Sequence, residues 1–295
     1  YKKYGMLVYA VSLLAIPALF ALIKYGPDII FLDQNLLFYI LIGLLFFVCF
    51  NLLRDGFKRG PVARDRILVL MILMTFNVVF WALFEQAGSS LTLFADRNVD
   101  RSVFGWFSMT ASQTQVFNPL FIILFGSIFS VMWVSLARIG KNPNIPMKFG
   151  LGIIQLGLGY LVLLLGIKVA GTDAMVPLVF LGLMYLLHTT GELFLSPIGL
   201  SMITKLSPKH MTGSAMGAWF LSAAFSMHVA SGLAVLTGGG EEGEAAGEAV
   251  IQLSAAEQLE NFGSVFGNMG YVAVGIGVLL VLLSKPLNKM MHGVE

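Results

Sequence analysis

The chain has 295 residues, 57% of them hydrophobic and 12% charged, whereas an ordinary soluble domain is about 25% charged. So few charged residues cannot coat a soluble globule of this length, and the apolar content excludes disorder and a coiled coil. A net charge of +2 from scattered basic residues gives no nucleic-acid footprint. The composition therefore predicts a membrane protein with the lipid bilayer as its surroundings.

Eight apolar runs are long enough to cross a bilayer, which takes about 20 residues per helix. They cover residues 4–25, 35–53, 66–91, 112–137, 147–170, 175–204, 212–237 and 262–284. The stretch 36–50 is apolar on every face, which excludes the alternating strands of a membrane barrel. We expect an all-α membrane protein.

Two connections organise the runs. The polar segment from Arg54 to Arg66 contains two glycines and a proline, which predicts a linker. We therefore expect residues 1–60 to form a two-helix transmembrane hairpin with a cytoplasmic linker, and residues 61–295 to form a six-helix bundle. The Gly/Glu-rich stretch 238–260 is expected to be a solvated outer loop, with an amphipathic surface element over 248–259 as the alternative.

The flanking charges predict the orientation. If the first helix starts in the cytoplasm, 14 of the 18 Lys and Arg residues fall on that side, and 11 of the 16 acidic residues fall outside. Basic residues gather in cytoplasmic loops. Both ends of the chain should therefore be cytoplasmic. The chain begins at Tyr1 rather than Met, and we therefore expect a processed or truncated polypeptide.

Two carboxylates, Glu85 and Glu192, remain inside the apolar runs. A charge at the centre of a membrane helix costs about 2.5–3.5 kcal/mol on insertion scales, so such residues are rare without a cavity, a partner or a proton path. A structural ion pair or a buried, protonated carboxyl is the alternative to a functional role. Neither residue has an intramembrane Lys or Arg partner in this chain, so the counter-charge of an ionised carboxylate would come from a substrate or from other helices.

Aromatic rings accompany the first carboxylate. Trp81 lies four residues before Glu85 and three before Phe84, so one helix face presents two rings beside a carboxylate. Such a face can line a pocket for an amine-bearing ligand through apolar and cation–π contacts. Packing against a neighbouring helix is the alternative for Phe84.

Polar and helix-breaking residues surround the second carboxylate. His188, Glu192 and Ser196 recur every four residues and should share one face. Pro197 predicts a bend or break in this helix, as at the binding sites of transporters. His188 is either a proton relay or a hydrogen-bonded interior residue. Asn118, directly before a proline, is a third polar position within the apolar runs, and we expect a helix kink there.

The motifs resemble a known family. The segments 80–86, 118–119 and 191–200, together with Trp219, are similar to the carboxy-terminal half of bacterial proton-coupled oligopeptide transporters, a branch of the major facilitator superfamily. The resemblance spans essentially the whole chain. It implies a six-helix half of a major facilitator transporter plus a two-helix hairpin insertion in the bacterial inner membrane. The implied activity is proton-coupled symport of di- and tripeptides by alternating access.

The resemblance also implies roles for individual residues. Glu192 and Asn118 would hold the amino terminus of the peptide, and Ser196 would support that site. Trp81, Phe84 and Trp219 would line side-chain pockets, although Trp219 could equally be a packing residue. Glu85, which Gln86 follows, would form an ion pair with an arginine of the family's first helix. This ion pair would act as a gate that responds to protonation.

That arginine and the basic residues that receive the peptide carboxylate belong to the family's amino-terminal half. The implied partners are therefore this six-helix half, a di- or tripeptide and protons, which are the coupling ion; no cofactor or metal is expected. The alternatives are a related facilitator for nitrate or a drug, a helical membrane subunit without transport activity, or an intramembrane enzyme. The sequence contains neither an H-E-x-x-H nor a G-x-S-x-G motif.

Overall fold

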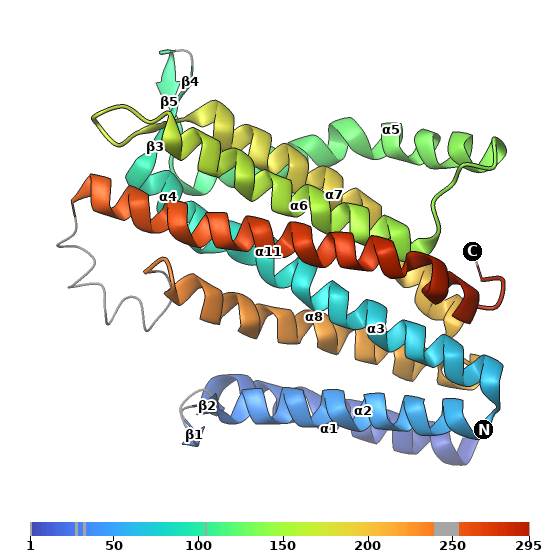
Figure 1. The fold of residues 1–295 in the computed structure, drawn as a ribbon. Helices are drawn as coiled ribbons and strands as arrows, with labels where there is room; N and C mark the ends of the chain where they lie inside the picture. Colours follow the sequence, from blue (N-terminus) through green and yellow to red (C-terminus); the bar gives the residue numbers. More distant parts are fainter. Residues whose placement is uncertain (1, 27–28, 32–33, 104, 239–253, 295) are drawn as a thin grey trace.

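The computed structural model describes residues 2–26, 29–31, 34–103, 105–238 and 254–294. Its long helices are α1 (Lys2–Tyr25), α2 (Leu36–Lys58), α3 (Pro61–Phe84), α4 (Ser90–Asn98), α5 (Phe117–Arg138), α6 (Ile145–Lys168), α7 (Leu178–Leu206), α8 (Thr212–Val235) and α11 (Ala255–Met290) (Figure 1). Short 3-10 helices occur at η1 (Glu85–Gly88), η2 (Ser112–Val116) and η3 (Lys209–Met211). Within the described residues, 8 helical segments are long and apolar enough to cross a membrane, which confirms the predicted all-α membrane fold.

Short strand pairs close one end of the bundle, at the left of Figure 1. β1 (Ile30–Phe31) and β2 (Gln34–Asn35) pair antiparallel between α1 and α2. β3 (Val99–Asp100) pairs parallel with β6 (Val176–Pro177), which joins the ends of two distant helices. β4 (Ser102–Val103) pairs antiparallel with β5 (Phe107–Ser108).

Glycines let the central helices approach closely. A Cβ atom on Gly157 of α6 would lie 2.8 Å from the carbonyl oxygen of Gly270 in α11, and one on Gly277 would lie 2.8 Å from the carbonyl oxygen of Gly150. On the α7 side of α6, a Cβ on Gly152 would lie 2.7 Å from the carbonyl oxygen of Gly191. In a membrane, small residues bring helix backbones together where burial from water cannot drive association. The three helices α11, α6 and α7 therefore form the tightest layer of the fold.

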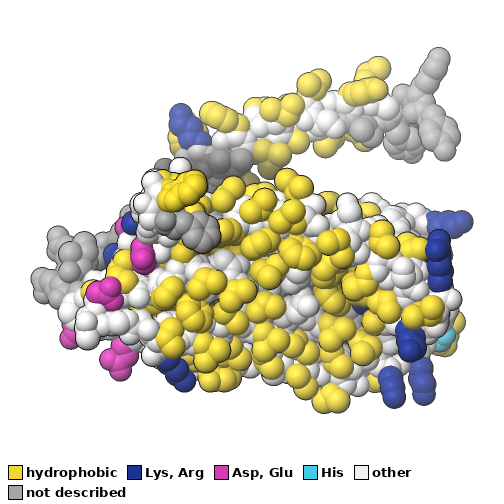
Figure 2. Space-filling model, turned by 90° about the horizontal axis from the view of Figure 1, so that it is seen from above, with side chains coloured by type: hydrophobic (Ala, Val, Ile, Leu, Met, Phe, Trp, Pro, Cys, Tyr) yellow, Lys and Arg dark blue, Asp and Glu magenta, His cyan; other side chains and the backbone are white. Residues whose placement is uncertain are grey.

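The two amino-terminal helices attach unequally. α2 packs against α3 and α8, and Leu52 of α2 is completely buried in the core. α1 makes no extensive contact with another described element, and Figure 2 shows it as a separate rod beside the bundle. The linker predicted over Arg54 to Arg66 is wrong in extent, because α2 continues to Lys58 and α3 begins at Pro61. Only a tight turn separates the hairpin from the helices that follow.

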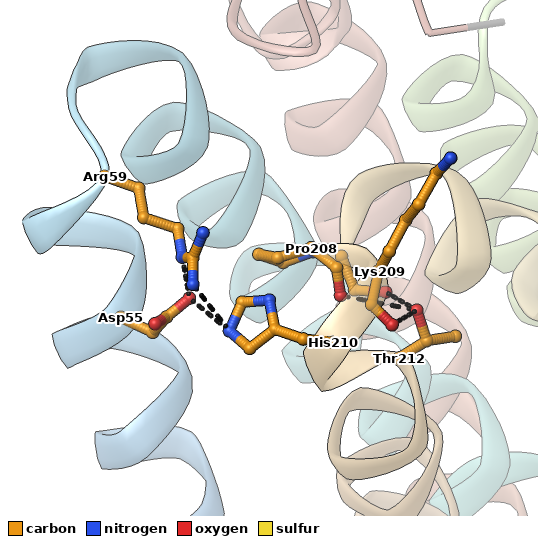
Figure 3. A network of polar contacts seen from close by, with 7 residues as sticks. Asp55, Arg59, Pro208, Lys209, His210 and Thr212 are labelled. Atoms are coloured by element: carbon orange, nitrogen blue, oxygen red, sulfur yellow. Dashed lines mark hydrogen bonds and ion pairs between the residues drawn. The ribbon is translucent and has the colours of Figure 1, made fainter.

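A polar cluster fastens α2 to the connection before α8 (Figure 3). The Arg59 Nε atom donates to Asp55 Oδ2 at 2.7 Å, and His210 Nε2 lies 3.2 Å from the same oxygen. At the other end of α2, the ring of Phe38 lies 4.4 Å from the ring of His228. These contacts hold α2 against α8 along its length.

The charges separate along the bundle. Figure 2 shows most of the Lys and Arg side chains at one end and most of the described Asp and Glu side chains at the other. α1 begins and α11 ends at the basic end (Figure 1). There, Arg66 of α3 donates to the carbonyl oxygens of Met291 (3.1 Å) and His292 (3.0 Å), which ties α3 to the end of the chain. The two chain ends therefore lie on the same side of the bundle, as the even helix count predicts.

The expected helix break is in another helix. The sequence predicts a bend or a break beside Glu192; α7 continues as one α-helix through Pro197, so the break is wrong and the bend stays a prediction. The span predicted over 66–91 is the interrupted one: α3 ends at Phe84, and the chain passes through η1 before α4. Most of the predicted outer loop and the first part of the amphipathic alternative, residues 239–253, lie outside the described residues.

Replacing Gly157 by Ala should destabilise the protein, because the added Cβ cannot be accommodated against the backbone of α11. We expect a cost of about 1–3 kcal/mol from overpacking. Thermal unfolding in detergent measures this as a lower Tm. Gly217→Ala is the matched control, since a Cβ there meets no atom within 4 Å; equal Tm values for the two variants would contradict the assignment of Gly157 to a close contact.

Candidate functional site

An interrupted helix places the first carboxylate. Glu85 is the first residue of η1, directly after the last turn of α3, and its side chain is half-buried. Ser89, between η1 and α4, has φ −127° and ψ −95°, which lies outside the helical region. The helical hydrogen-bond ladder is therefore broken immediately beside a carboxylate inside a membrane span.

Gln86 stabilises the interruption through its side-chain amide. This residue is completely buried, and its Nε2 atom donates to the carbonyl oxygens of Ala82 (3.0 Å) and of Ala230 in α8 (3.0 Å). Ser90 at the start of α4 donates to Gln86 Oε1 at 2.7 Å, and Thr237 Oγ1 lies 2.7 Å from Ser90 Oγ. The amide thus joins α3, α4 and α8. Gln86 does not line the cleft described below. The expected role of Gln86 beside Glu85 in gating stays a prediction.

Three further hydrogen bonds hold the interruption and the start of α4 in place. The Tyr160 hydroxyl of α6 donates to the carbonyl oxygen of Leu83 at 2.6 Å. The Thr92 hydroxyl of α4 donates to the carbonyl oxygen of Ala87 at 2.7 Å, and Gln115 of η2 donates to Thr92 at 2.9 Å. Backbone groups freed inside a bilayer are costly unless the protein satisfies them. These side chains therefore compensate for the loss of helical hydrogen bonds.

A cleft of about 470 Å³ opens beside the interruption. Glu85 lines it together with polar side chains from η2, α5 and α7 and with the ring of Phe84. The lining residues are Phe84, Glu85, Ala87, Gly88, Gln115, Val116, Asn118, Pro119, Tyr185 and His188. No Lys or Arg of the described residues lines it. An acidic and amide-rich cleft without a cation can accept a positively charged ligand group.

The second carboxylate lies next to this cleft. Asn118, in the first turn of α5, donates through Nδ2 to Glu192 Oε2 at 3.3 Å and to Thr189 Oγ1 at 3.1 Å. Asn118 lines the same cleft as Glu85, so this amide connects the surroundings of the two carboxylates. No ion pair involves either carboxylate within the described part of the chain. The structure thus brings together three of the residues singled out in the sequence.

The other expected site residues lie in several places. Phe84 lines the cleft and meets the ring of Trp81 edge to face, with 5.3 Å between ring centroids; Trp81 itself is not among the lining residues. Ser196 has a buried hydroxyl oxygen without a hydrogen-bond partner among the described residues. Trp219 is buried against α7, where a Cβ on Gly199 would lie 2.5 Å from its ring. The roles of these residues stay predictions.

Sequence reasoning missed three polar neighbours of the site, namely Thr189, Tyr185 and the side chain of Gln115 as a cleft residue. Thr189 and Tyr185 precede Glu192 by three and seven residues, so all three share a face of α7. That helical spacing could have identified both. Gln115 carried a weaker signal, because its position depends on how η2 packs against α4.

A helical membrane bundle with a polar cleft beside an interrupted helix has the architecture of a secondary transporter. The family model described as "PTR2: POT family" matches residues 45–278. The chain belongs to this family, and it is a multi-pass membrane protein.

The relatives include dipeptide and tripeptide permease B of Xenorhabdus bovienii, with 32% identity over 81% of this chain and 47% of the relative. Dipeptide and tripeptide permease A of Cronobacter turicensis is 34% identical over 80% of this chain and 45% of its own length. A crystal structure of a peptide transporter POT with sulfate has a TM-score of 0.71 and 27% identity, covering 99% of this chain and 55% of that one. The chain therefore spans about half the length of the relatives it matches.

Replacing Gln86 by Leu should destabilise the fold, because the carbonyl oxygen of Ala230 and the Ser90 hydroxyl lose a buried partner. We expect a loss of about 1–3 kcal/mol, measured as a lower Tm in detergent. Gln113→Leu is the control, since Gln113 is exposed. An unchanged Tm for Gln86→Leu would show that the buried amide does not stabilise the interruption.

Proposed function

We propose that this chain forms the carboxy-terminal half of a proton-coupled symporter for di- and tripeptides. The observation that carries the proposal is the cleft lined by Glu85 and Asn118, without any cation from the described residues, beside which Glu192 accepts a hydrogen bond from Asn118. A peptide brings a cationic amino terminus, which is the group that such a site lacks. Membership of the POT family and the names of the curated relatives support this choice of substrate.

The amino terminus of the peptide binds between Asn118 and Glu192. The Glu192 carboxylate already accepts one hydrogen bond from Asn118, and its remaining lone pairs can accept an ammonium group. The Asn118 carbonyl oxygen is a second acceptor. Charge-assisted hydrogen bonds of this kind are about twice as strong as neutral ones, and the low dielectric of a membrane cleft strengthens them further.

The carboxylate end of the peptide needs a cation, and within the part of the chain that the structure describes no Lys or Arg lines the cleft. We therefore assign the recognition of the peptide carboxylate to a six-helix amino-terminal half that faces this one. Transport would follow from alternating exposure of the cleft between the two halves. The substrate would bias this equilibrium through its different affinities for the two states.

Glu85 is the proposed proton carrier. Glu85 is the first residue after α3, where the regular α-helical hydrogen bonds stop. A change in the charge of its side chain therefore acts on a segment that these backbone hydrogen bonds do not hold. Protonation would release a cationic partner from the facing half and shift the equilibrium between the two exposed states. The proton and the peptide would thus act on neighbouring carboxylates of one cleft.

We infer that the basic end of the bundle faces the cytoplasm of a bacterial inner membrane. Lys and Arg residues gather at that end, together with both chain ends. The bias of basic residues towards cytoplasmic loops sets the orientation of helical membrane proteins.

Glu192→Gln in the full-length reading frame should reduce uptake of a labelled dipeptide by about 10- to 100-fold, which corresponds to the loss of one hydrogen bond to a charged group. The variant should fold normally, because Gln keeps the shape and can still accept a hydrogen bond from Asn118. Glu260→Gln, on the exposed start of α11, is the control. Unchanged uptake by the Glu192 variant would remove this residue from the site. An excess of nitrate that competes better than unlabelled dipeptides would overturn the proposed substrate class.

Glu85→Gln should impair the coupling of transport to protons and leave the binding of the peptide intact. Uptake driven by a proton gradient should fall at least about tenfold, whereas exchange of labelled for unlabelled peptide without a gradient should be retained. Both are measured in proteoliposomes with the full-length protein. Normal gradient-driven uptake by this variant would exclude Glu85 as the proton carrier.

A further inference from the structure

A lysine is buried at the basic end of the bundle, far along the sequence from both carboxylates. Lys148, in the first turn of α6, is only 7% exposed. Its Nζ atom lies 4.3 Å from the ring centroid of Trp133. No carboxylate of the described residues forms an ion pair with it, and the charged group that acts on it is another cation, Lys205 of α7.

The Lys148 side chain is thus largely buried without an anionic partner among the described residues. Removing a charge from water is unfavourable unless a partner compensates for the lost hydration. The contact with the Trp133 ring compensates only in part, and the nearby ammonium group of Lys205 repels that of Lys148. The balance favours an anion close to Lys148.

The space for such an anion is present. A pocket of about 400 Å³ lies between the α5–α6 connection and the end of α11, and Lys148 lines it. Polar side chains contribute to the same wall, in particular Asn142 and Asn288, whose amides can donate to an anion. The third lining amide, Asn144, is the N-cap of α6 and accepts a hydrogen bond from the backbone of Met147 at 2.9 Å. The positive end of the α6 dipole therefore also points towards this pocket.

We propose that this pocket binds a phosphate group, supplied by an anionic phospholipid headgroup or by free inorganic phosphate. A helix N-terminus together with a lysine and amide donors is a recurrent arrangement for phosphate oxygens. The pocket lies at the basic end of the membrane spans, where lipid phosphates meet the protein, and basic pockets between helices on that side recognise anionic headgroups. Phosphate binding there would link the α5–α6 connection to α11 and so stabilise the bundle opposite the strand-paired end.

The test is ligand-dependent unfolding of the full-length protein, purified in a neutral detergent. The probes are inorganic phosphate, short-chain phosphatidylglycerol and short-chain phosphatidylcholine, with acetate and chloride at equal ionic strength. We expect a saturable rise in Tm with inorganic phosphate or phosphatidylglycerol. Lys148→Met should weaken the apparent affinity by about tenfold or more, because it removes the charge and keeps the length of the side chain.

Matched variants make the result specific. Lys141→Met removes an exposed lysine of the same connection and should respond like the wild type. Lys148→Arg keeps the charge and should retain the response, which separates a binding role from a folding defect. A response to inorganic phosphate alone assigns the site to the free ion, and a response to phosphatidylglycerol alone assigns it to the lipid.

Three outcomes would overturn the proposal. The first is the absence of a saturable shift with either phosphate probe, and the second is an equal shift in Lys148→Met and the wild type. The third is a shift that depends on Lys148 with acetate but with neither phosphate probe. That result would assign the pocket to a carboxylate group from another polypeptide segment.

Discussion

A helix that is interrupted inside a membrane exposes backbone groups that no water can satisfy, and the fold is organised around one such interruption. Between Phe84 and Ser90, the α-helical ladder gives way to a 3-10 turn. Gln86 bonds this turn to α8, and Tyr160 bonds it to α6. Because these partners are buried and specific, the interruption is fixed in position, and with it the carboxylate of Glu85.

The same constraint explains why the polar residues of the cleft converge. An unpaired carboxylate is tolerated in a membrane span where it faces a cavity or a partner. Glu85 faces the cleft, and Glu192 accepts a hydrogen bond from Asn118 across the α5–α7 contact. The tight layer of α11, α6 and α7 supports one side of this arrangement. α5 forms the other side, and none of its residues is buried in the described structure.

Much of this arrangement could be predicted from the sequence, because the bilayer permits few structures. The eight runs, the shared side of the two chain ends and the two intramembrane carboxylates all follow from hydropathy and charge. Family motifs brought Asn118 and Glu192 into one site, and the structure brings them within hydrogen-bond distance.

The helix break was misplaced for an equally physical reason. Pro197 interrupts one hydrogen bond, yet α7 continues through it, since a membrane helix tolerates proline when its neighbours compensate. At Glu85 the break has no proline and depends on contacts with residues far along the chain, such as Ala230, which local sequence cannot reveal. The buried state of Lys148 likewise depends on packing between α5, α6 and α11.

The central claim is that the interrupted helix and the Asn118–Glu192 pair form one binding site for the cationic end of a peptide. A structure of the full-length protein with a bound dipeptide tests it most directly. Our account predicts the peptide ammonium within hydrogen-bond distance of Asn118 and Glu192, in the cleft that Glu85 lines. A dipeptide whose ammonium contacts neither residue would contradict the account.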